Sequence, residues 1–123
     1  MSTNPTRARL QSFVYAFRGA ATLLRTQPNA RIHAVATLLV VAGGLFLGLS
    51  APEWSMLTVA ITMVWTAEAL NTAVEFLADE VTLEQRPRIA QAKDVAAFAV
   101  LVSSIAAVVI GLTVFVPRLL HFH

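Results

Sequence analysis

The sequence contains no cysteine, and only 13% of its 123 residues are charged. Without cysteine there is no disulfide framework, no thiolate metal site and no cysteine nucleophile. The charged share is about half that of a typical soluble domain. A small globule leaves much of its surface exposed, so a soluble chain of this length could not hide the 57% of its residues that are hydrophobic. The composition excludes a secreted disulfide scaffold, a disordered tail and a typical soluble enzyme, and it indicates a membrane protein of one domain, residues 1–123.

Soluble nucleotide-binding motifs are also missing. The sequence has no Walker A loop, no GxGxxG turn and no HRD or DFG kinase set. The net charge of +2 is too small to indicate a nucleic-acid partner. No acidic residue precedes Glu53, so the chain up to that point carries basic charge only. The positions of the charges therefore tell more than their sum.

Three long apolar runs are present. They lie at 32–52, 54–78 and 95–117. A helix needs about 20 residues to cross the hydrocarbon core of a membrane. The sequence therefore predicts an all-α integral membrane protein with three transmembrane helices, at about 32–50, 54–79 and 94–117. A tight turn at 50–53, where Pro52 blocks continuation, and a polar loop at roughly 80–92 are expected to connect them.

The basic residues predict the orientation of these three spans in the membrane. Three spans put the chain ends on opposite sides of the membrane. Every lysine and arginine except Arg118 then lies on the side of the N-terminus. Basic residues favour the cytoplasmic side, so we expect a multi-pass protein of the plasma membrane with a cytoplasmic N-terminus.

The segment before the first span, at about 7–26, shows the pattern of an amphipathic surface helix. Its apolar residues share one stripe of a helix: Leu10, Phe13, Val14, Phe17, Ala21 and Leu24. Gln11, Arg18 and Arg25 lie together beside that stripe. Such a helix can lie in the inner interface with its arginines toward anionic headgroups. A plain membrane anchor is the alternative, and a break is expected at 26–29.

The second span carries carboxylates, which are costly inside a membrane and rarely incidental. At about 100° per residue, one arc of about 100° holds Glu68, Asn71, Thr72, Glu75 and Asp79. Glu68 and Glu75 are about 10 Å apart along the helix axis, too far to share one proton. This spacing indicates two separate tasks, one deep in the membrane and one near the cytoplasmic water.

Lys93, the only lysine, precedes Asp94 at the start of the third span, at the same level as Glu75 and Asp79. A carboxylate cluster with a lysine and arginines at one membrane face can hold a metal ion and a polyphosphate. The alternative for Lys93 and Asp94 is a pair of ordinary interfacial charges. The alternative for Asn71 is hydrogen bonding between packed helices.

Two motifs together resemble one family. The run AEALNTAVE at 67–75, followed by KDVAA at 93–97, resembles the prokaryotic diacylglycerol kinase family, which includes diacylglycerol kinase of Gram-negative bacteria and undecaprenol kinase of Gram-positive bacteria. The resemblance covers about residues 9–117. It also includes Ser12, Phe13, Tyr15, Ala16, Phe17, Gly19, Asn29, Arg31, Ile32 and His33.

The resemblance implies a membrane lipid kinase without a P-loop, built as a homotrimer of three-span subunits. Such an enzyme binds Mg²⁺ and ATP at the cytoplasmic face and transfers the γ-phosphate to a lipid alcohol. By matching positions, Glu68 is the general base, Asn71 supports it and Glu75 is a magnesium ligand. The positions matching nucleotide contacts are Tyr15, Glu84, Arg86, Lys93 and Asp94.

The sequence departs from the family at two positions. Where the family usually has a second magnesium-binding glutamate, at the end of the surface helix, this chain has Gln27. An amide oxygen can ligate Mg²⁺ but adds no negative charge. Weaker metal binding, assistance from Asp79 or reduced activity are the possible consequences. Phe98 replaces a residue that is often small, which would reshape the lipid groove.

The sequence leaves more than one acceptor lipid and more than one class of function open. Diacylglycerol and undecaprenol both present a primary hydroxyl at headgroup level. The runs at 71–73 and 95–97 look closer to undecaprenol kinases, so undecaprenol is favoured. A small multispan transporter using Glu68 and Glu75 is the runner-up to the kinase, but the Lys93-Asp94 pair and the arginine-rich inner face do not support it. A non-catalytic membrane subunit is the third hypothesis.

Overall fold

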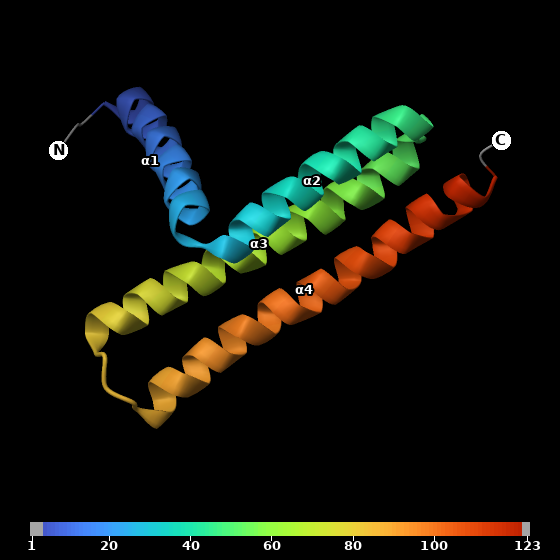
Figure 1. Ribbon diagram of the computed structural model, residues 1–123. Coiled ribbons are helices and arrows are strands. Elements are labelled where there is room, and N and C mark those ends of the chain that lie inside the picture. The colour runs from blue at the N-terminus through green and yellow to red at the C-terminus, as the bar shows by residue number, and fades with distance from the viewer. Residues whose placement is uncertain (1–3, 122–123) are drawn as a thin grey trace.

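The computed structural model describes residues 4–121 as four α-helices (Figure 1). They are α1 (Pro5–Thr26), α2 (Pro28–Leu47), α3 (Ala51–Val81) and α4 (Pro87–Leu120). Three of them, α2, α3 and α4, are long and apolar enough to cross a membrane. The predicted all-α architecture with three membrane-spanning helices is confirmed. The outermost residues of the predicted single domain, 1–3 and 122–123, lie outside the described residues.

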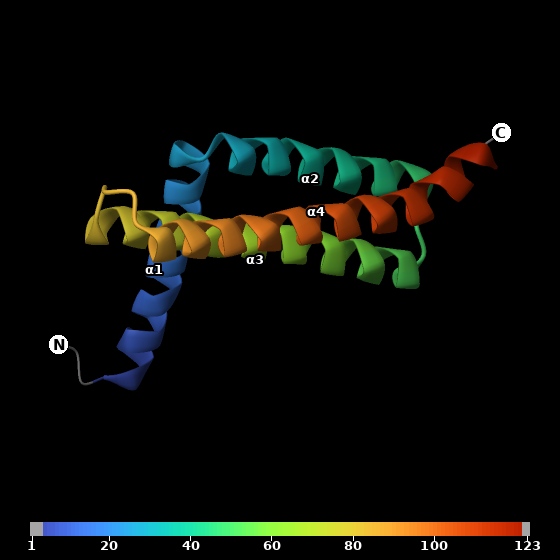
Figure 2. The same cartoon turned by 90° about the horizontal axis from the view of Figure 1, so that it is seen from below.

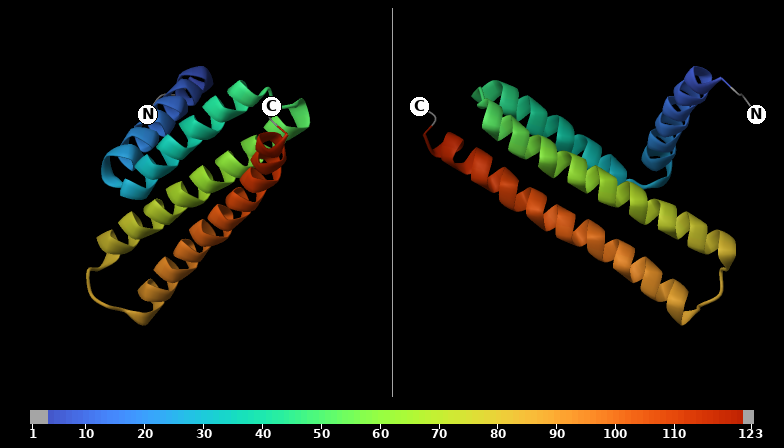
Figure 3. Two further views of the ribbon diagram at one scale, coloured as in Figure 1. Left: turned by 45° about the vertical axis from the view of Figure 1, so that its right-hand side comes forward. Right: turned by 180° about the vertical axis from the view of Figure 1, so that it is seen from behind.

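The three long helices form an antiparallel bundle. α3 and α4 pack side by side along much of their length, and α2 packs against α3 (Figures 1 and 3). α1 leaves the bundle at a sharp corner and extends away from it, so its tip lies far from the other helices (Figure 2). The guanidinium of Arg31 fixes this corner, because Nε donates to the carbonyl of Leu24 at 2.9 Å and Nη2 to that of Arg25 at 2.8 Å.

The turn between α2 and α3 lies earlier in the chain than predicted. α2 ends at Gly48, whose φ of +65° is easily reached only without a side chain. Ser50 caps α3, and its backbone N–H donates to Oε1 of Glu53 at 3.0 Å in a capping box. Pro52 therefore does not block a helix. It lies in the first turn of α3, where a backbone N–H would have no partner in the helix.

The connection between α3 and α4 is shorter than the predicted loop at 80–92. It spans only residues 82–86, and Pro87 begins α4 with the φ angle that a first helical residue needs. The polar residues before and after it continue the two helices instead. Hydropathy marks where a helix leaves the membrane, whereas the helix itself ends only where capping and backbone geometry end it.

At the opposite end of the bundle, contacts join all three long helices. Arg118 of α4 forms two hydrogen bonds with Glu53 of α3, one of them from Nε to Oε2 at 3.1 Å. Gly44 of α2 faces Trp54, and a Cβ at Gly44 would lie 2.6 Å from Cη2 of that ring. A buried cluster lies beside these contacts: Leu49, Leu57 and Val114.

Candidate functional site

The centre of α3 carries three polar side chains, each with a buried oxygen that has no hydrogen-bond partner among the described residues. Glu68 is 1% exposed, and its Oε2 has no hydrogen-bond partner among the described residues. Asn71 Oδ1 and Thr72 Oγ1, one turn further along α3, are unpartnered in the same way. Buried polar atoms in folded proteins are nearly always hydrogen-bonded. This stretch is therefore a place where a ligand or another chain could supply the missing partners.

A histidine from α2 faces Glu68. Nε2 of His33 lies 3.7 Å from Oε2 of Glu68, just beyond hydrogen-bond length. The imidazole packs edge-on against Trp65, with ring centroids 6.5 Å apart and planes at 64°. Trp65 Nε1 donates to Thr37 Oγ1 at 3.0 Å, and Thr37 Oγ1 donates to the carbonyl of His33 at 2.7 Å. The sequence pattern around His33 does not indicate this contact, because Glu68 lies on another helix.

Grooves approach this centre from three sides. A groove of about 830 Å³ between α3 and α4 is lined by Asn71, and one of about 550 Å³ between α1 and α3 is lined by Thr72. His33 lines a third groove of about 430 Å³ between α2, α3 and α4. The side chains of these grooves are mostly apolar. Glu68 itself lines none of these grooves, but His33, Asn71 and Thr72 near it each line one, and apolar grooves with a few polar groups are typical of ligand sites.

Glu75 and Gln27 lie at a common depth. Gln27 precedes His33 by about 9 Å along α2, and Glu75 follows Glu68 by about 10 Å along the antiparallel α3. Because His33 faces Glu68, these steps bring Gln27 and Glu75 to one level of the bundle. The amide of Gln27 donates only to Thr26 Oγ1, at 3.2 Å. The Glu75 carboxylate makes no hydrogen bond or ion pair within residues 4–121.

This donor pair fits Mg²⁺ only together with phosphate. Mg²⁺ in phosphoryl-transfer sites usually takes one or two carboxylates, with phosphate oxygens and water completing an octahedron. Glu75 supplies a free carboxylate, and Gln27 an amide oxygen that accepts no hydrogen bond in the described part of the chain. Residues 4–121 contain no cluster of three or more histidines, cysteines or acids that could hold a metal alone.

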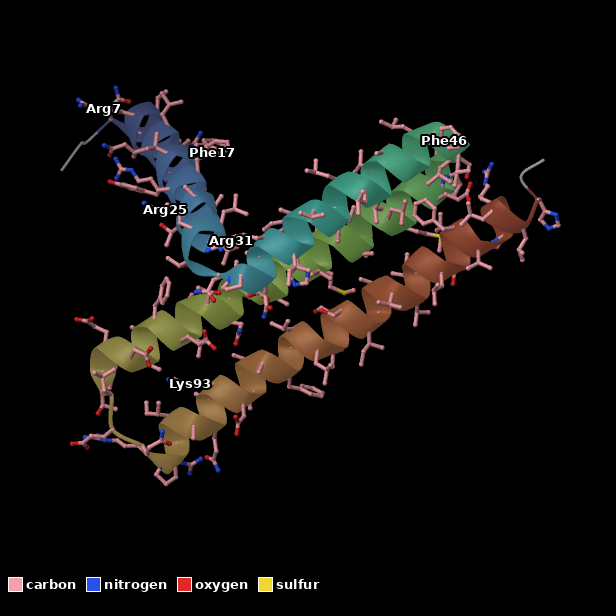
Figure 4. All side chains as sticks on the ribbon, in the orientation of Figure 1. Arg7, Phe17, Arg25, Arg31, Phe46 and Lys93 are labelled. Carbon is pink, nitrogen blue, oxygen red and sulfur yellow. The ribbon has the colours of Figure 1, made fainter. Side chains whose placement is uncertain are left out.

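Charged side chains gather at the 82–86 end of the bundle. Lys93 of α4, labelled in Figure 4, pairs through Nζ with Oδ1 of Asp79 of α3 at 2.7 Å, so Lys93 lies at the level of Asp79, as predicted. Arg86 pairs with Glu84 at 3.4 Å, and Asp94 is exposed beside Lys93. Both pairs are well exposed, so each contributes little to stability and can be exchanged for another ligand.

Tyr15 is the predicted site residue that a single chain does not bring to the others. It is 58% exposed on α1, with the Arg18 guanidinium 5.6 Å from its ring centroid. It precedes Gln27 by about 18 Å of helix, and α1 points away from the bundle (Figure 2). Phe17, on the predicted apolar stripe, is 74% exposed, and it projects from a different face of α1 than Arg7 and Arg25 (Figure 4).

Similarity to known proteins was found along most of the chain. Residues 14–115 match the family model described as prokaryotic diacylglycerol kinase. The chain is 38% identical over 109 residues to the undecaprenol kinase of Bacillus subtilis, covering 89% of each chain. It is 38% identical over 112 residues to the diacylglycerol kinase of Synechocystis sp., covering 90% of this chain and 64% of that protein.

Proposed function

Because the chain belongs to the prokaryotic diacylglycerol kinase family and is a membrane-embedded lipid kinase, we propose that it transfers the γ-phosphate of ATP to a lipid alcohol. The observation that carries this proposal is Glu68, a buried carboxylate with an unpartnered oxygen beside apolar grooves. The positions of the basic residues support a site at the cytoplasmic face, with the N-terminus on that side.

In the proposed reaction, Glu68 accepts the proton of the lipid hydroxyl as the oxygen attacks the γ-phosphorus. A new oxygen–phosphorus bond forms, and the bond from the γ-phosphorus to the β–γ bridging oxygen breaks. ADP leaves with the electron pair of that bond, and the proton stays on Glu68 until water takes it. Asn71, one turn along α3, supports this step, because its amide NH₂ group can donate a hydrogen bond to the carboxylate of Glu68.

In this proposal the nucleotide binds nearer than Glu68 to the end of the bundle where residues 82–86 connect α3 and α4. Glu75, with Gln27 at the same depth, would hold Mg²⁺, which when bound would offset the negative charge of the phosphate oxygens. The ion pair of Lys93 with Asp79 is exposed, so Lys93 can leave Asp79 and bind a phosphate oxygen of the nucleotide instead. Arg86 lies in the adjoining loop and can meet the same polyphosphate. Glu84 and Asp94 match positions that contact the nucleotide through hydrogen-bond acceptors.

We further propose a homotrimer, because one chain leaves the site incomplete. Tyr15 lies on α1, which extends away from the bundle that carries Lys93. The apolar stripe of α1 is largely exposed, and Asn71 Oδ1 and Thr72 Oγ1 have no hydrogen-bond partner within residues 4–121. A neighbouring subunit's α1 can cover the polar face of α3, since such groups are not left facing lipid. The number three comes from the family resemblance.

The proposed acceptor is undecaprenol. The two relatives are equally identical to this chain, but the undecaprenol kinase is matched over 89% of its length and the diacylglycerol kinase over 64%. The test uses purified protein in mixed micelles with Mg²⁺, radiolabelled ATP and either lipid at equal mole fraction. Faster labelling of undecaprenol is expected. Faster labelling of diacylglycerol would reverse the preference, and no labelled lipid from folded protein would refute the proposed transfer.

A further inference from the structure

We propose that His33 is a positioning residue for Glu68, donating a hydrogen bond from Nε2 to Oε2 so that Oε1 is directed at the lipid hydroxyl. This inference rests on the proposed function of Glu68 as the base. It assigns the first membrane-spanning helix a part in the reaction. The two atoms are 3.7 Å apart, so a small rotation of either side chain closes the bond.

The buried position of Glu68 favours a hydrogen-bond donor to its Oε2. The residue is 1% exposed, and Oε2 is the carboxylate oxygen that is buried without a hydrogen bond among the described residues. An unpaired buried oxygen on a charged group is strongly unfavourable. Nε2 of His33, 3.7 Å from Oε2, is a nitrogen that a small movement brings within hydrogen-bond range.

His33 is held in place for this contact. Its ring packs edge-on against Trp65, and its carbonyl accepts a hydrogen bond from Thr37. Trp65 donates to that same hydroxyl, which ties α2 to α3 at this level. Trp65 precedes Glu68 by about one turn of α3, so the ring that packs against the imidazole belongs to the helix that carries the base.

The imidazole also remains accessible. Its side chain is 22% exposed, against 2% for the Glu68 side chain, and it lines the groove between α2, α3 and α4. The imidazole thus lies near the buried oxygen of Glu68 and also borders a groove. A residue present only for packing would need the ring but not the nitrogen.

Two amide variants separate these roles. The nitrogen of Gln in His33→Gln can occupy the place of Nε2, whereas that of Asn in His33→Asn reaches only the place of Nδ1. In the micelle assay, we expect His33→Asn and His33→Ala to lower kcat about 10- to 100-fold with unchanged KM for ATP, which is the effect of losing one hydrogen bond to a charged group. His33→Gln should recover most of the loss. His121→Ala is the control histidine and should keep wild-type kinetics.

Coupling to Glu68 gives the decisive comparison. In a Glu68→Gln background, adding His33→Ala should cost no further activity, because the carboxylate that His33 orients is already gone. Equal kcat for His33→Asn, His33→Gln and the wild type would overturn the proposal. An inactive wild type would instead refute the proposed function.

A spectroscopic measurement does not depend on activity. In ¹⁵N NMR spectra of the detergent-solubilised protein, the Nε2 resonance of His33, assigned by its absence in His33→Gln, should shift in Glu68→Gln. The Nε2 resonance of His121 should stay in place. An unmoved His33 resonance would show that the two side chains do not interact, and would overturn the proposal even if the kinase proved inactive.

Discussion

Gln27 is where this chain leaves its family, and Gln27→Glu tests the proposed metal site. The structure allows this change without disturbing the corner between α1 and α2. Gln27 ends α1 through its backbone N–H, which donates to the carbonyl of Leu23 at 2.9 Å. Its carbonyl accepts from Ala30 at 3.1 Å and Arg31 at 3.4 Å, and its side chain caps neither helix. A glutamate can therefore replace Gln27 while both helix ends keep their hydrogen bonds.

The expected effect follows from the charge that is added. Two opposite unit charges about 4 Å apart interact by about 4 kcal/mol at the effective dielectric of a protein surface. Desolvation, salt screening and the nearby Arg31 guanidinium reduce this interaction. We expect about 1 to 2 kcal/mol to remain, which is roughly tenfold in affinity for Mg²⁺.

The assay is a Mg²⁺ titration of lipid phosphorylation at saturating ATP. For Gln27→Glu, the concentration giving half-maximal rate should fall roughly tenfold, with the thermal unfolding midpoint unchanged when nucleotide is absent. Gln11→Glu makes the same chemical change on α1, about 24 Å of helix away, and should leave the titration unmoved. An unshifted curve for Gln27→Glu would remove Gln27 from the metal site and leave Glu75 as the proposed ligand.

Three further expectations can be measured. Glu75→Gln should raise the Mg²⁺ requirement and lower turnover, and a wild-type titration curve would contradict the ligand assignment. Gly44→Ala should lower the free energy of unfolding by about 1 to 3 kcal/mol through overpacking against Trp54, measured by denaturation in detergent. Gly111→Ala is its control, with nothing within 4 Å of the added Cβ, and should unfold like the wild type. Cross-linking in micelles should yield trimers, and active monomers would contradict the shared site.

The sequence was enough to predict the spans and the polar face of α3, because both depend on local patterns. A span requires about 20 apolar residues whatever it packs against. Helical periodicity places Glu68, Asn71 and Thr72 together, and the structure leaves a polar atom of each buried without a partner. The turn and loop boundaries were wrong because capping by Ser50 and the position of Pro87, rather than hydropathy, decide where the helices begin.

The contact between His33 and Glu68 could not be read from periodicity, because it joins two helices whose relative register only packing determines. The sequence could have indicated this contact only through the number of residues that separate each position from the membrane surface. His33 follows Gln27 by nearly the same number of residues as Glu68 precedes Glu75, so equal depth of one pair implies equal depth of the other in antiparallel helices. The level shared by Lys93 and Asp79 was predictable, because both residues lie close to the same short connection.

The most direct test of Glu68 as the base compares Glu68→Gln with the wild type in single-turnover lipid phosphorylation, with MgATP binding measured on the same samples. The predicted result is normal nucleotide binding with phosphoryl transfer slowed roughly 10²- to 10⁴-fold, the usual contribution of a positioned general base. Normal binding with a near wild-type transfer rate would contradict the account, because the buried carboxylate would then take no part in the reaction.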